Sequence, residues 1–217
     1  MAVTMHDLKN REFWLNQRYR SIGGSDAACL LGMNPYMNNV ELWEIRTHRR
    51  KREDISDVPF VRYGIEAEDH LRELFKLDYP QYQVEYVENN LWVNDKYPYA
   101  HASLDGWLTD EDGRRGILEI KTVNVVNQAV KHKWDDRIPD NYYCQVLWYM
   151  GVYEADFAVV KAQLKWERGD SVLEVTKHYH IEREEVAEEI DYILQKGAEF
   201  HEYIKSDTCP PLNLPEI

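Results

Sequence analysis

The sequence has few cysteines, and they stand far apart. Its three cysteines, Cys29, Cys144 and Cys209, include no C-x-x-C pair, which argues against a zinc or iron–sulfur site and indicates reduced thiols. No apolar run is long enough to span a membrane. The first residues hold no apolar segment of the signal-peptide kind, so we expect a cytoplasmic location. Since no linker rich in Gly, Ser or Pro divides the chain, we predict one domain over 1–208 and a loosely ordered, proline-rich tail at 209–217.

Positive charge is also scarce. The 217 residues include 26 Lys and Arg against 39 Asp and Glu, a net charge of −13 that by itself disfavours a nucleic-acid partner. The distribution is uneven, because residues 1–52 hold nine basic and five acidic residues while the remainder carries −17. An acidic body with a basic face is compatible with DNA binding and also with a plain soluble protein. The content of 44% hydrophobic and 12% aromatic residues indicates a globular chain with a core.

The stretch His101–Thr122 carries the clearest chemical pattern. It predicts two strands joined by a polar hairpin at 109–116. Alternation along the second strand puts Glu119 and Lys121 on one face, and Asp105 on the first strand adds a second carboxylate. Two carboxylates beside an ammonium suit metal-assisted phosphodiester hydrolysis, because hard cations such as Mg²⁺ prefer oxygen ligands. A surface hairpin with a cross-strand ion pair would give the same pattern, so the pattern alone does not decide.

Two glycine positions predict further parts of a site. Gly64 falls in a helix predicted over 60–77, where a missing side chain indicates a close approach, with Glu68 beside it. Ser25 follows two glycines and is expected to cap a short helix over 27–31. Free backbone N–H groups at such a helix start suit a phosphate, although an ordinary capped helix accounts for the pattern more often.

The remaining pattern predicts one α/β domain. The basic run Arg46–Arg52 ends a helix predicted over 40–46 and is either solvated or follows a DNA backbone. A central mixed sheet flanked by helices fits the order of elements. We expect helices over 6–17, 124–134, 141–152 and 183–204, strands over 156–164 and 172–181, and a hairpin formed by 82–87 and 90–93.

Several stretches, in order and spacing, resemble one family. The sequence is similar to the phage λ exonuclease and YqaJ group of viral recombination nucleases, within the PD-(D/E)xK superfamily. The resemblance covers roughly residues 14 to 160, and Leu104 stands where the family pattern has a proline before the aspartate. The matching stretches are Trp14–Arg18, Ile22–Ala28, Gly64–Glu68, Ala102–Gly106, Leu118–Thr122 and Tyr143–Gln145.

The resemblance implies a role for each matching residue. It implies a PD-(D/E)xK restriction-endonuclease-like core that binds one or two Mg²⁺ or Mn²⁺ ions. Lys121 would be the catalytic lysine, and Gln145, with Tyr149 in Q-x-x-x-Y spacing, would complete the catalytic set. The implied metal ligands are Asp105, Glu119, Glu68 and the backbone carbonyl of Ile120. The implied ligands of a terminal 5′-phosphate are Arg18, Ser25 and Ser103.

The implied activity is that of an alkaline-exonuclease-type deoxyribonuclease. It would digest one strand of duplex DNA 5′→3′ from a 5′-phosphorylated end to mononucleotides, leaving 3′ overhangs for phage-type recombination in a bacterial host. Implied partners are duplex DNA ends, a single-strand annealing protein and two further copies in a homotrimeric ring. One alternative is an endonuclease or repair nuclease on the same core. A further alternative is a non-catalytic DNA-binding phage protein.

Overall fold

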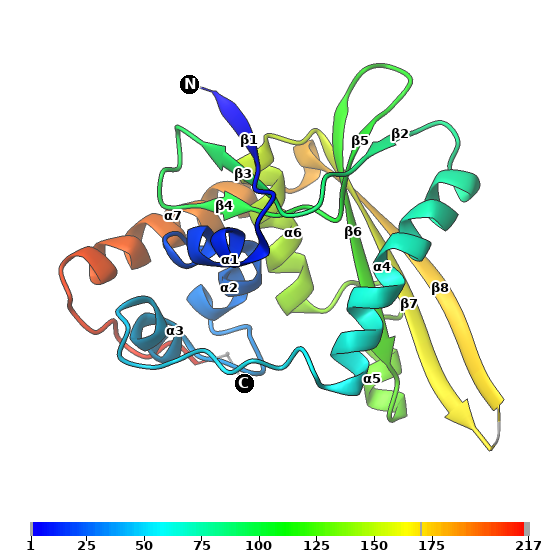
Figure 1. Ribbon diagram of the computed structural model, residues 1–217, viewed down its shortest axis with the longest axis horizontal. Coiled ribbons are helices and arrows are strands. Elements are labelled where there is room, and N and C mark those ends of the chain that lie inside the picture. Colours follow the sequence, from blue (N-terminus) through cyan, green and yellow to red (C-terminus); the bar gives the residue numbers. More distant parts are fainter. Residues whose placement is uncertain (1, 170, 215–217) are drawn as a thin grey trace.

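A five-stranded mixed sheet forms the centre of the molecule. The computed structural model describes residues 2–169 and 171–214. Strand order is β2-β5-β6-β7-β8, with β6 and β7 parallel and the other neighbours antiparallel. Figure 1 shows β7 and β8 extending as a long hairpin at one side of the molecule. The strands are β2 (Gln83–Glu85), β5 (Gly106–Thr109), β6 (Arg115–Asn124), β7 (Phe157–Arg168) and β8 (Ser171–Glu182).

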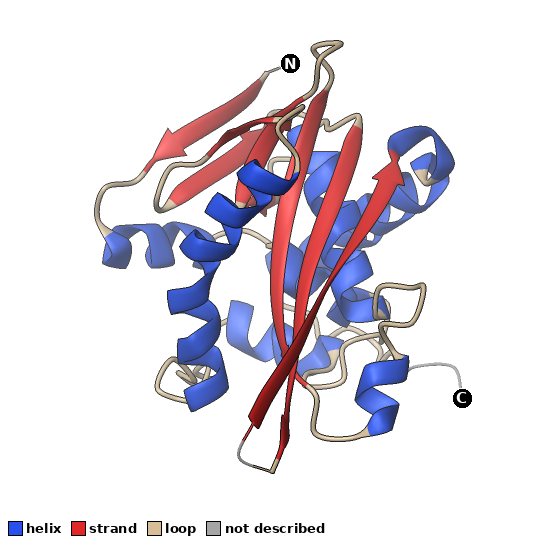
Figure 2. Cartoon of the chain, turned by 90° about the vertical axis from the view of Figure 1, so that its right-hand side faces the viewer, coloured by secondary structure: helices blue, strands red, loops and turns tan. Residues whose placement is uncertain are grey.

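Helices cover both faces of this sheet (Figure 2). Helix α4 (Pro59–Asp78) packs Leu71 and Phe75 on Leu118 and Ile120 of β6. The opposite face, which includes Ile117, packs on α2 (Gly24–Leu30), α6 (Asp140–Tyr153) and α7 (Ala187–Lys205). The predicted alternation along β6 is therefore confirmed. The remaining helices are α1 (Arg11–Tyr19), α3 (Asn39–Arg46), α5 (Gln128–His132) and a 3₁₀ turn, Arg183–Glu185.

A second sheet of three antiparallel strands lies beside the first. It consists of β1 (Val3–Asp7), β3 (Asn90–Asn94) and β4 (His101–Ala102), in the order β1-β3-β4. The predicted hairpin of 82–87 with 90–93 is wrong, because β2 pairs with β5 whereas β3 pairs with β1 and β4. The left-handed backbone of Asn89, with φ of 56°, turns the chain out of one sheet and into the other.

The predicted N-terminal helix starts later than expected. His6 and Asp7 belong to β1, and α1 begins at Arg11 because the Asn10 side chain accepts a hydrogen bond from Phe13 N at 3.0 Å. This helix buries none of its residues, and Phe13 is 51% exposed. The predicted helices over 40–46, 60–77 and 141–152 are confirmed by α3, α4 and α6.

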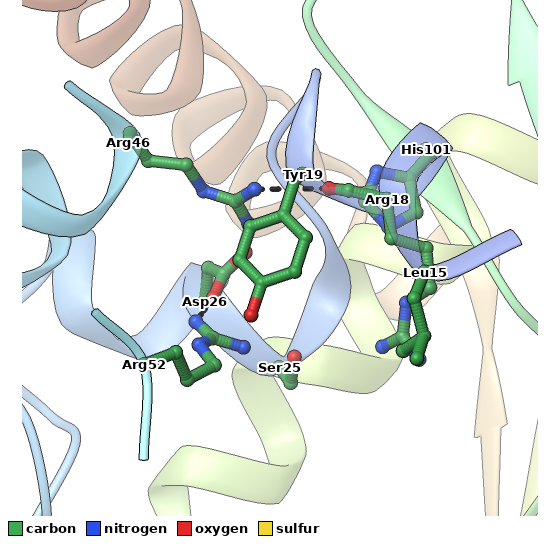
Figure 3. A pocket seen from close by; sticks show the side chains of 8 residues that line it. All are labelled: Leu15, Arg18, Tyr19, Ser25, Asp26, Arg46, Arg52 and His101. Carbon is green, nitrogen blue, oxygen red and sulfur yellow. Dashed lines mark hydrogen bonds and ion pairs between the residues drawn. The ribbon is translucent and has the colours of Figure 1, made fainter. Parts of the chain in front are cut away.

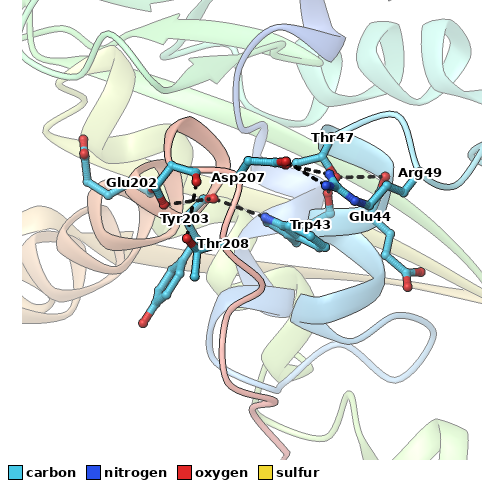
Figure 4. A network of polar contacts seen from close by, with 9 residues as sticks. Trp43, Glu44, Thr47, Arg49, Glu202, Tyr203, Asp207 and Thr208 are labelled. Atoms are coloured by element: carbon cyan, nitrogen blue, oxygen red, sulfur yellow. Dashed lines mark hydrogen bonds and ion pairs between the residues drawn. The ribbon is translucent and has the colours of Figure 1, made fainter.

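The C-terminal segment is tied to the body of the protein. In the described part, 209–214, Asn213 donates to Leu30 O at 2.9 Å and Asn39 donates to Pro211 O at 2.7 Å. The proline-rich tail over 209–217 stays a prediction, and 215–217 lie outside the described ranges. Just before the tail, Trp43 and Arg49 contact the end of α7 (Figure 4). Within 2–169 and 171–214, the helices are all too short or too polar to cross a bilayer.

Candidate active site

The predicted pair of carboxylates meets where β5 begins beside β6. Asp105 Oδ2 accepts a hydrogen bond from the backbone N of Ile120 at 2.8 Å. Glu119 is only 1% exposed, and its Oε1 accepts from the Lys121 ammonium and from Gln145 Nε2, the latter at 2.7 Å. The β5–β6 hairpin thus brings two acids and a lysine to one place, and helix α6 adds the amide of Gln145.

Helix α4 supplies a third carboxylate from the other side. A Cβ on Gly64 would lie 2.8 Å from Thr122 Oγ1, so the predicted close approach at Gly64 is confirmed, and the neighbour is β6. Glu68, one turn later, accepts from Arg72 at 2.6 Å. Arg72 also donates to the carbonyl of Asp105 at 2.5 Å and is nearly buried, with 4% of its side chain exposed. Sequence reasoning missed Arg72, although its i,i+4 spacing from Glu68 was a usable signal.

Burial raises the pKa of all three carboxyl groups of the site. Desolvation, followed by the neighbouring charge of Asp105, raises the pKa of both Glu68 and Glu119. Desolvation likewise raises the pKa of Asp105. Burial alone would lower the pKa of Lys121, but the charges of Glu119 and Asp105 outweigh it and raise the pKa above its usual range. Lys121 is therefore a fixed cation among carboxylates that need further positive charge.

The donor set has the chemistry of a hard divalent cation. Glu119 Oε2 is buried and has no hydrogen-bond partner among the described residues, so one carboxylate oxygen is free to bind an ion. Asp105 and Glu68 offer further oxygens. As the side chains stand, no three His, Cys, Asp or Glu residues within the described ranges group tightly enough to hold a metal. Arg72 and Lys121 occupy positions on these carboxylates, so a bound ion would compete with them.

A tyrosine connects this site to the start of α2. Gln145 Nε2 lies 3.2 Å from the hydroxyl of Tyr149 as well as donating to Glu119. The Tyr149 ring packs against Gly24, where a Cβ would come within 2.3 Å of Cε1. Any side chain at position 24 would displace the ring, and with it a neighbour of Gln145.

A cavity of about 90 Å³ includes Ser25, the residue after Gly24, in its lining (Figure 3). Arg18 and Ser25, two of the three predicted phosphate ligands, both line it. Ser103, also within the described chain, lies outside this lining, and its buried hydroxyl has no hydrogen-bond partner among the described residues. The full lining is Leu15, Arg18, Tyr19, Ser25, Asp26, Arg46, Arg52 and His101.

Local structure differs here from the prediction. Ser25 does not cap its helix; the cap is Gly23, whose N–H donates to the Asp26 carboxylate at 3.1 Å. The shift by two residues leaves the Ser25 hydroxyl free of capping and on the cavity wall. Burial, and then the charge of Arg18, lower the pKa of His101 to about 3, so its imidazole is neutral at physiological pH.

The layers and the carboxylate–lysine cluster define an α/β protein with a PD-(D/E)xK-like fold. The closely matching solved structures include an alkaline exonuclease from Laribacter hongkongensis, at 18% identity and a TM-score of 0.63, covering 90% of this chain and 95% of that one. The same enzyme in complex with dAMP matches with a TM-score of 0.64 at 17% identity, over 90% of this chain and 95% of that one. A phage-related exonuclease from Haemophilus somnus 129PT matches with a TM-score of 0.50 at 13% identity, over 89% of this chain and 99% of that one.

Residues 13–156 match the model of the YqaJ-like viral recombinase domain, and the chain belongs to this family. The uncharacterized protein YqaJ of Bacillus subtilis strain 168 is 29% identical over 183 residues, which are 80% of this chain. The chain spans about half, 55%, of the length of this curated relative. The family resemblance and the fold class predicted from the sequence are confirmed.

Proposed function

We propose that this protein is a divalent-metal-dependent exonuclease that digests the 5′-phosphorylated strand of duplex DNA in the 5′→3′ direction. The observation that carries the proposal is the convergence of Glu68, Asp105, Glu119 and Lys121 beside a cavity lined by Arg18 and Ser25. Ser25 of the cavity follows Gly24, which packs on the Tyr149 ring. The Tyr149 hydroxyl lies 3.2 Å from the Gln145 amide that donates to Glu119, so the two places adjoin. The fold of the exonucleases that resemble it agrees with this function.

The residues of the chain divide the chemistry between them. Glu68, Asp105, Glu119 and the Ile120 carbonyl would hold one or two Mg²⁺ or Mn²⁺ ions. Bound there, the metal would activate water and polarise the scissile phosphate. Lys121 stays protonated and neutralises charge on the phosphate, while Gln145 orients Glu119 by donating to it. The buried walls exclude bulk water and strengthen these electrostatic interactions.

The cavity favours an exonuclease over an endonuclease on the same core. Arg18 stacks on the Trp14 ring, with 4.4 Å between the guanidinium carbon and the ring centroid, which fixes its planar donors in place. A terminal phosphate held there would set a strand end next to the carboxylates.

We carry over from the family a homotrimeric ring, a single-strand annealing partner and work in the cytoplasm of a phage-infected bacterium. A single domain ending near residue 208 remains a prediction.

Removing the Arg18 guanidinium tests recognition of the strand end. Arg18→Ala should slow digestion of 5′-phosphorylated duplex by about tenfold or more, because a charge-assisted bond to the phosphate is lost. Digestion of a 5′-hydroxyl duplex should change little. The measurement is a time course with Mg²⁺ on substrates whose two strands carry separate labels. An equal loss on both ends would refute the end-binding role, and internal nicks in closed circles would favour the endonuclease.

The metal assignment has its own measurement. Glu119→Gln keeps the shape of the side chain but removes the charge that would bind a cation, so Mn²⁺ affinity should fall by about tenfold or more. Isothermal titration calorimetry with Mn²⁺ measures this without any turnover. The matched control is Glu199→Gln on the exposed face of α7, which should bind Mn²⁺ like the unaltered protein. Unchanged affinity in Glu119→Gln would place the ligands elsewhere.

A further inference from the structure

The basic run Arg46–Arg52 divides into residues that face the surface and residues that face inward. Arg49 pairs with Asp207 at 2.7 Å, and Arg50 pairs with acids of α3. Arg46 and Arg52, at the two ends of the run, turn instead toward the cavity that contains Arg18. Figure 3 shows them approaching Asp26 from the side opposite Arg18. The two ends of the run therefore differ from its exposed middle, because they pair with a buried carboxylate.

Asp26 holds both guanidiniums from beneath. Its carboxylate is 2% exposed; one oxygen pairs with Arg46 and the other with Arg52, the latter at 2.5 Å. Burial by itself would raise the pKa of Asp26, but the charges of Arg46 and Arg52 outweigh it and hold the pKa well below its usual range. Asp26 therefore remains ionised and fixes the positions of two cations.

The two arginines differ in how many of their N–H donors remain free to bind a ligand. Arg46 has 6% of its side chain exposed, and its terminal nitrogens donate to Asp26 and to the carbonyl of Arg18, the latter at 2.9 Å. Arg52 has 32% of its side chain exposed, and one of its nitrogens donates to Asp26. The Nε atoms of both are buried without a hydrogen-bond partner among the described residues. Arg52 can thus still donate to a ligand, whereas Arg46 mainly positions its neighbours.

The charge of the cavity matches one kind of phosphate. Arg18, Arg46 and Arg52 bring three positive charges, Asp26 brings one negative charge, and His101 is neutral. A phosphate monoester at a strand end carries about −1.5 to −2 near neutral pH, whereas a phosphodiester within a strand carries a single negative charge. A volume of about 90 Å³ has room for a group the size of several waters.

Resting on the proposed function, we infer that Arg52 is a specificity-determining residue that binds the terminal phosphate monoester opposite Arg18. Asp26 and Arg46 are positioning residues that hold Arg52 at the cavity wall. Two guanidiniums on opposite sides discriminate a doubly charged end from a hydroxyl end or a diester. A single arginine would discriminate less, because it neutralises half of that charge.

The test compares Arg52→Ala with a matched arginine that lies outside the cavity. Arg50→Ala is the control, since Arg50 pairs with Glu41 and Glu44 and does not line the cavity. Each full-length protein is assayed for KM and kcat on duplexes that end in a 5′-phosphate, a 5′-methyl phosphate diester or a 5′-hydroxyl. Thermal unfolding verifies that each variant is folded, and Arg52→Gln, which keeps most of the side-chain length, replaces Arg52→Ala if the latter does not fold.

The expected result is a loss of discrimination located in KM. Arg52→Ala should raise KM for the 5′-phosphate end by about tenfold or more, with KM for the hydroxyl end nearly unchanged. Arg52→Lys should restore part of the effect, and Arg50→Ala should behave as the unaltered protein. Full discrimination in Arg52→Ala, or an equal loss on all three ends, would overturn this inference alone. Equal digestion of all ends by the unaltered protein would overturn the proposed end recognition as well.

Discussion

Replacing Lys121 by alanine should reduce DNA digestion by about a thousandfold while duplex binding is retained. The ammonium is paired with Glu119, has 18% of its side chain exposed, and stays charged because Glu119 and Asp105 raise its pKa. Its loss removes the protein's own fixed positive charge from the place where, in the proposed reaction, negative charge would develop during hydrolysis. Single-turnover digestion with Mg²⁺ measures the rate, and fluorescence anisotropy with a labelled duplex measures binding.

A second lysine provides the control for this result. Lys196→Ala removes an ammonium from α7, where it pairs with Glu199 away from the carboxylates, and should leave the rate unchanged. The thermal midpoint of Lys121→Ala should stay close to that of the unaltered protein. Without the ammonium, a buried carboxylate can take up a proton, which removes the uncompensated negative charge. Normal turnover in Lys121→Ala would rule out the active site described above.

Removing Asp26 should have the largest effect on stability. Asp26→Ala leaves Arg46 buried without its counter-charge, and breaking such a pair costs about 3–5 kcal/mol of unfolding free energy. For a chain of this size, the thermal midpoint should fall by about 10 °C. Because the folded-state pKa of Asp26 is depressed, the pair stabilises the fold above the ordinary pKa of 3.8 and loses this effect as the pH falls below it. The difference from the unaltered protein should therefore be full at pH 7.

An exposed ion pair nearby gives the comparison. Asp207→Ala removes the partner of Arg49, where the two side chains are 64% and 42% exposed, and should cost less than about 1 kcal/mol. Denaturant titration of the three proteins under identical conditions measures the free energies directly. Equal small losses in Asp26→Ala and Asp207→Ala would show that Arg46 can reach water, and that the pair beneath the cavity contributes little.

Local patterns were sufficient for the parts of the chain whose structure depends on local packing. The alternation of Leu118, Glu119 and Ile120 predicted the two faces of β6, and Gly64 predicted a close approach, which the structure shows at Thr122. The helix predicted over 183–204 also agrees with α7, which buries Ile190. In each case the residue type and the period of the element point to the same answer.

Pairings between distant segments could not be predicted in the same way. Strand β3 was paired with the wrong partner because a two-residue turn signal at Asn89 does not reveal that β1 completes its sheet. Arg52 and Asp26 lie 26 positions apart in the sequence, and the guanidinium of Arg52 donates to the carboxylate of Asp26. No sequence pattern predicted this contact. Such contacts depend on tertiary geometry, which no local period encodes.

The packing of Tyr149 on Gly24 bears on the size of the fragment that each step of digestion would release. The ring lies between the start of α2, with its Ser25, and Gln145 beside the carboxylates of the candidate site. Tyr149 is 3% exposed and belongs to the main core, so rigid interior atoms would set the separation between the proposed phosphate site and the proposed site of hydrolysis. Digestion should then advance in steps of one constant size, with uniform fragments released whatever the base sequence.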